Sequence, residues 1–130
     1  MRGASALQEM LSELKGKRLR VFAVWEPVIA TDVAPPTTGV LSRLSDPRAI
    51  QYWDKSRVLS GLLVRTALRK WKDFPGVEEM KEDSVVWDCV LIFPAGQRWE
   101  KEPPRPEFAD CPVVNVIEGA RSHLSGPPGS

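Results

Sequence analysis

Two stretches of the chain are apolar at nearly every position, which is typical of β-strands that are covered on both faces. They are residues 20–25 and residues 85–93. The first strand should end near Glu26, because Pro27 cannot donate a hydrogen bond within a sheet. The second is followed by a Pro-Ala-Gly turn, so we expect it to form a hairpin with a short return strand at 97–99.

Four further stretches are predicted to be helices, from apolar residues at helical spacing and from the capping and breaking residues around them. They are residues 5–15, 38–44, 58–71 and 113–124. Ser5 and Gln8 have the spacing of a capping box at the start of the first helix. Either Asp54 or Ser56 is suited to cap the third helix.

Residues 48–53 are rich in β-formers and predict a further strand, although Asp46 before Pro47 is equally typical of a helical turn. The resulting order is helix, strand, helix, strand, helix, hairpin, helix. This order predicts a three-layer α/β fold with a central mixed sheet of about four strands, flanked by helices. The 130 residues suit a single domain, expected at 1–124, with a flexible tail at 125–130.

Three segments carry a family resemblance: VFAVWEPV, VVWDCVLIFPAGQRW and PVVNVIEGARSHL. Over residues 18–124 they resemble, in turn, the strand before the active-site loop, the central hairpin and the closing helix of thioredoxin-like domains. The chain departs from that family because Glu-Pro-Val-Ile follows Trp25 where a Cys-x-x-Cys motif is expected. The cis-proline before the hairpin strand is also replaced, by Ser84-Val85-Val86. The chain is therefore most similar to uncharacterised bacterial thioredoxin-like proteins without the paired cysteines, and the resemblance implies a redox-inactive domain.

Charge and composition exclude several classes of protein. Eighteen Lys and Arg against seventeen Asp and Glu leave a formal charge of +1, so no strong field attracts nucleic acid. The longest apolar run is too short to span a membrane. The first twenty residues lack the apolar stretch of a secretory signal, so two free cysteines in a cytoplasmic protein are expected. A periplasmic or secreted location is the alternative if a leader was removed.

A candidate ligand site follows from the predicted topology. Ligands of open α/β sheets bind beyond the carboxyl ends of the parallel strands, and the hairpin strand should bring its early residues to the same edge. The site is predicted to contain Trp25, Glu26, Asp32, Asp54, Trp87 and Asp88. Clustered carboxylates suit a hard cation or an acid–base pair. Helix capping and core packing are the commoner reasons for such residues.

Three functions remain to be weighed. The favoured one is a redox-inactive, thioredoxin-like binding domain that takes a protein or peptide partner at Trp25 and the proline-rich loop after it, with no catalytic residue, metal or cofactor assigned. The alternative is a carboxylate-based metal-binding or hydrolytic enzyme at Glu26, Asp54 and Asp88. The third is a peroxidase or thiol sensor that uses Cys111. The exposed edge of the hairpin is compatible with self-association into a homo-oligomer.

Overall fold

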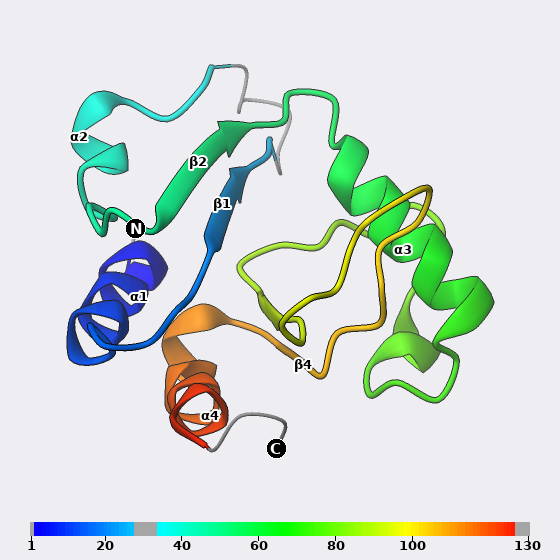
Figure 1. The fold of residues 1–130 in the computed structure, drawn as a ribbon. Helices are drawn as coiled ribbons and strands as arrows, with labels where there is room; N and C mark the ends of the chain where they lie inside the picture. The colour runs from blue at the N-terminus through cyan, green and yellow to red at the C-terminus, as the bar shows by residue number, and fades with distance from the viewer. Residues whose placement is uncertain (1, 28–33, 127–130) are drawn as a thin grey trace.

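The structure is a computed structural model that describes residues 2–27 and 34–126 (Figure 1). It confirms a mixed α/β chain. Its elements are α1 (Arg2–Glu13), β1 (Val21–Trp25), α2 (Thr38–Leu41), β2 (Ala49–Trp53), α3 (Val58–Lys70), the 3-10 turn η1 (Val77–Glu79), β3 (Val90–Ile92), β4 (Phe108–Asp110) and α4 (Val113–Ser125). The four helices surround two small sheets of two strands each.

The first sheet pairs β1 with β2 in parallel, and Trp25 is the register partner of Trp53. Because parallel strands run in the same direction, both tryptophans lie at the carboxyl end of the sheet. The prediction of a strand near 48–53 is confirmed, and the helical alternative is wrong. The Asp46 carboxylate accepts a hydrogen bond from the backbone N–H of Arg48, so it stabilises the turn that enters β2.

The second sheet pairs β3 with β4 in antiparallel orientation, so the predicted hairpin is wrong. Among the described residues, 97–99 form no strand, and the Trp99 ring packs edge-on against Phe93 with centroids 5.3 Å apart. The predicted strand 85–93 is also too long. Asp88 has a φ of 53°, which lies in the left-handed region and interrupts an extended strand, so β3 begins only after it.

Since β1 and β3 belong to different sheets, a single four-stranded sheet is not confirmed. The side chains instead form two hydrophobic clusters. One lies around Met10, where α1 and α4 pack side by side against both sheets, and the other lies around Trp71 at the end of α3 (Figure 1). β3 lies between them, with Val90 and Ile92 in the first cluster and Leu91 in the second. Burial on both sides explains the apolar run in this strand.

Both ends of α1 differ in detail from the sequence prediction. The helix already includes Ser5, so the predicted capping box is wrong. The side-chain carbonyl of Gln8 instead accepts hydrogen bonds from the backbone N–H groups of Ser45 and Asp46, at 2.8 and 2.9 Å. The Arg48 guanidinium donates to three carbonyl oxygens at the other end of the helix. The turn before β2 is therefore fixed to α1 at two places.

Cys89 and Cys111 are joined by a disulfide bond, which corrects the prediction of two free thiols. The bond links the residue before β3 to the residue after β4, with a sequence separation of 22. The two cysteines become neighbours only because β3 and β4 align, a pairing that the sequence prediction did not contain. A thiol sensor needs a free thiol, so the disulfide removes the basis for that function in this state.

Candidate functional site

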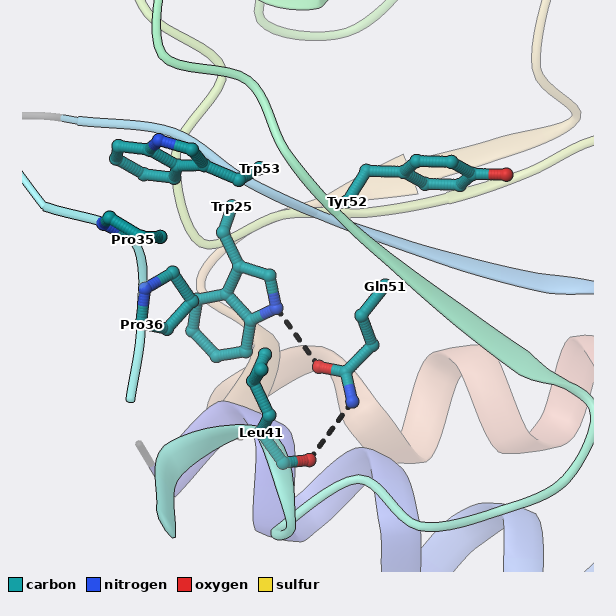
Figure 2. Close-up of a pocket in the computed structure, with 7 residues that line it drawn as sticks. All are labelled: Trp25, Pro35, Pro36, Leu41, Gln51, Tyr52 and Trp53. Atoms are coloured by element: carbon teal, nitrogen blue, oxygen red, sulfur yellow. Dashed lines mark hydrogen bonds between the residues drawn. The ribbon is translucent and has the colours of Figure 1, made fainter. Parts of the chain in front are cut away.

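A pocket lies at the carboxyl ends of β1 and β2, where the sequence predicts a ligand site (Figure 2). Its volume is about 150 Å³. The lining residues are Trp25, Pro35, Pro36, Leu41, Gln51, Tyr52 and Trp53. Two of them, Trp25 and Trp53, end the paired strands, whereas the prolines precede α2 and Leu41 ends it. The pocket is therefore built between the sheet and the segment that leads into β2.

Gln51 holds the two sides of this pocket together. Its side-chain oxygen accepts a hydrogen bond from the indole N–H of Trp25 at 2.9 Å. Its amide nitrogen donates to the carbonyl oxygen of Leu41 at 2.9 Å (Figure 2) and to that of Leu44 at 3.1 Å. Alternation along β2 places Gln51 on the same face as Trp53. Both amide hydrogens of Gln51 and the indole N–H of Trp25 are thus already used within the described part of the inner wall.

The indole of Trp53 provides the remaining polar group of the pocket. Its N–H makes no hydrogen bond with the described residues, in contrast to that of Trp25. Figure 2 shows its nitrogen on the ring edge turned away from Pro35. The Tyr52 side chain points away from the two prolines, is 51% exposed and stacks on Phe22. The pocket thus combines aromatic and proline surfaces with one donor at its rim.

Glu26 and Asp54 are brought together, as the sequence predicts, but both bind the N-terminus of α3. Glu26 accepts hydrogen bonds from the hydroxyl and the backbone N–H of Ser60, at 2.6 and 3.1 Å. Asp54 accepts from the backbone N–H groups of Val58 and Leu59, at 3.1 and 2.8 Å. These N–H groups have no partner within the helix, and the helix dipole favours negative charge beside them. Of the two predicted caps, Asp54 binds the first turn of α3, although Arg57 occupies the N-cap position itself, and Glu26 shares that role.

Burial raises the pKa of Glu26 above its ordinary value of 4.5. The two hydrogen bonds from Ser60 oppose this rise because they stabilise the carboxylate, while the negative charge of nearby Asp54 adds to it. Two carboxyl groups therefore lie close together at the N-terminus of α3. Their combined charge depends on whether Glu26 is protonated.

We expect Glu26→Gln to flatten the dependence of stability on pH. A carboxyl whose folded-state pKa is raised contributes stability below its unfolded-state value, and that contribution is lost as pH rises through the folded-state value. Urea unfolding of the wild type should therefore show stability falling from about pH 4.5 toward neutrality. The glutamine variant should show a smaller fall, whereas Glu100→Gln, at an exposed position, should follow the wild type. Parallel curves for all three proteins would contradict this role of Glu26.

Trp87 and Asp88 do not join this site, which corrects the prediction. The Asp88 carboxylate lies 3.0 Å from the position that a Cβ would occupy on Gly3, and its carbonyl accepts from the backbone N–H of Val113. Asp88 therefore faces α1 and the start of α4. Trp87 is 64% exposed and does not line the pocket. The prediction failed because it required β3 to lie beside β1. The remaining candidate, Asp32, is outside the described residues.

The carboxylates of the described residues form no cluster of three. Within residues 2–27 and 34–126, no three His, Cys, Asp or Glu side chains are placed to hold a metal ion. The two carboxylates that do converge are occupied by helix N–H groups. Sequence reasoning missed Gln51, although its position two residues before Trp53 is a signal that both side chains share one face of a strand.

Among the described helices, none has the length and hydropathy needed to cross a lipid bilayer. Comparison with family models, curated proteins and solved structures gave no match to this chain.

Proposed function

We propose that this chain is a non-catalytic binding domain that takes an apolar side chain of a protein or peptide partner in the Trp25–Trp53 pocket. The volume of the pocket carries the proposal. A cavity of about 150 Å³ is large enough for one benzene-sized ring, whereas sites for drug-sized ligands and cofactors measure about 300–1,000 Å³. One anchoring side chain of a larger partner fits this size better than a cofactor does.

The state of the carboxylates favours binding over catalysis. Glu26 and Asp54 would have to release the N–H groups of α3 before they could hold a cation or activate water. The half-buried Trp53 and the exposed Pro35 line the pocket and need no such rearrangement to meet a partner. Tryptophan is also among the residues that contribute most to binding energy at protein interfaces. The enzyme alternative therefore has less support.

A thioredoxin-like origin remains part of the proposal. It is supported by the parallel pairing of β1 with β2 and by the final helix α4. The separation of β3 and β1 into different sheets counts against it. The Cys89–Cys111 disulfide favours a location in an oxidising compartment, because disulfides persist there and are rare in a reducing cytoplasm. We therefore favour the periplasmic or secreted alternative over the cytoplasmic one.

The binding proposal is tested with Trp53→Ala and a matched control, Trp87→Ala. The probes are uncharged peptides of about ten residues, each with one central leucine, phenylalanine or proline. We expect at least one peptide to shift the indole N–H signals of Trp25 and Trp53 in a ¹H–¹⁵N spectrum. Trp53→Ala should weaken that binding about tenfold or more, as loss of an interface anchor does. Trp87→Ala should leave it unchanged, because Trp87 lies outside the pocket. Equal effects of the two substitutions, or no peptide bound, would contradict the proposal.

A further inference from the structure

We propose that the anchor received by the pocket is a proline within an uncharged, extended segment of the partner. The inference rests on the proposed binding function and narrows it to one class of ligand. Three properties of the pocket support it: the shape of its walls, the donors and acceptors of its side chains, and its lack of charge.

The walls of the pocket suit a flat, ring-shaped side chain. Figure 2 shows the Pro36 ring beside the indole of Trp25 and the Pro35 ring beside that of Trp53. Leu41 lies on the side of α2. Grooves lined by aromatic rings are a recurring site for polyproline segments, whose rings present a rigid apolar surface. The volume of about 150 Å³ admits one such ring and excludes two.

The hydrogen-bonding groups of the pocket favour a ligand that accepts and does not donate. The Trp25 N–H and both amide hydrogens of Gln51 are used within the protein. The Tyr52 hydroxyl points away from the two prolines, so among the described lining side chains beside the prolines the Trp53 N–H is left to bind a ligand carbonyl. The side-chain oxygen of Gln51 already accepts from Trp25. Any other residue inserted here would bury a backbone N–H beside the Gln51 oxygen, an acceptor that Trp25 already uses. Proline has no N–H and keeps its carbonyl.

The described part of the lining carries no charged side chain, and this narrows the class of ligand further. None of the described lining residues is an acid, a lysine, an arginine or a histidine. An ionised side chain inserted into this pocket would lose its water without gaining a partner. A polyproline segment also loses little conformational entropy on binding, because its extended form is already populated in the free peptide. The pocket therefore favours a neutral, proline-centred segment over a charged or flexible one.

The experiment compares three peptides that differ only at the central residue. The central residue is proline, leucine or N-methyl-leucine, in an otherwise identical uncharged sequence that contains further prolines. Isothermal titration should show the proline peptide binding about tenfold or more tightly than the leucine peptide, because leucine buries an unsatisfied N–H. N-methyl-leucine lacks that N–H, so it should recover part of the lost affinity. This recovery separates the donor argument from ring shape alone.

Trp53→Phe provides the second arm, since it keeps an aromatic ring and removes the donor. It should reduce the affinity for the proline peptide about fivefold or more, as loss of one hydrogen bond does. Binding of the wild type should also move the Trp53 indole N–H signal downfield. Leucine binding as tightly as proline, or Trp53→Phe binding as well as the wild type, would overturn the proline inference and leave the binding proposal standing. Failure of every peptide to bind would overturn both.

Discussion

Replacing Arg48 with alanine is expected to lower the free energy of unfolding by about 2–3 kcal/mol, because hydrogen bonds that involve a charged group contribute about 1.5–3 kcal/mol. The Arg48 side chain is only 18% exposed and forms a salt bridge with Asp46, whose side chain is 8% exposed. The same guanidinium donates to the carbonyl oxygens of Leu11, Leu14 and Lys17. Alanine would remove the ion pair and all three of these bonds at once, and the half-buried Asp46 carboxylate would keep only the hydrogen bond from the backbone N–H of residue 48. Urea denaturation at pH 7 measures the loss.

Arg48→Lys is the matched control for charge. Lysine keeps the positive charge but cannot span the carboxylate and all three carbonyls with one compact ammonium group. Its stability should therefore lie between those of the alanine variant and the wild type. The wild-type pair should also persist in acid, because Arg48 lowers the pKa of Asp46 from 3.8 to about 2. Its contribution is lost only as pH falls toward that value. A loss below about 1 kcal/mol for the alanine variant would show that the contact is a weak surface pair.

Removing the Cys89–Cys111 bond is expected to destabilise the protein by about 3 kcal/mol. The estimate follows from the entropy that a cross-link of this separation removes from the unfolded chain. The closed loop contains both strands of the second sheet and the proline-rich segment between them. The variant Cys89→Ala/Cys111→Ala should unfold at a lower urea concentration than the wild type.

The control for this prediction is the wild type after reduction by dithiothreitol. Reduction should give nearly the same loss as the double substitution, because both act mainly on the unfolded chain. Reduction should have no effect on the double variant itself. A reduced wild type that is as stable as the oxidised one would contradict a stabilising role for the bond, as would a stability change in the variant on adding the reductant.

Local patterns in the sequence predict the elements of this fold better than their pairing. The apolar spacing of residues 58–71 and 113–124 predicts two helices that the structure contains. The strand at 48–53 and its parallel relation to 20–25 also follow from composition and element order. In each case the determining interactions are local, or depend on the usual geometry of a strand–helix–strand unit.

Apart from the capping box of α1, the errors concern contacts between residues distant in sequence. Nothing in the residues near 85–93 indicates that the partner strand lies at 108–110, because any short extended segment offers the same backbone groups. The αL conformation of Asp88 and the disulfide at Cys89 likewise arise from the three-dimensional arrangement. The site prediction inherited this error: Glu26 and Asp54 do lie together, whereas Trp87 and Asp88 lie elsewhere.

The pocket itself was only half predictable. The positions of Trp25 and Trp53 follow from strand ends in parallel register, and Trp25 was named from the sequence. The contributions of Leu41 and Gln51 depend on how α2 folds back onto β2 through two hydrogen bonds from one amide group. Such side-chain bonds to the backbone have no periodic signature in a sequence.

The central claim is that the Trp25–Trp53 pocket receives an apolar group of a partner. Isotope-filtered nuclear Overhauser spectra of the labelled protein with the unlabelled proline peptide test it most directly. The account predicts cross-peaks from the central proline ring to the indole protons of Trp25 and Trp53. Cross-peaks confined to the exposed rings of Phe22 or Trp87, which lie outside the pocket, would contradict it.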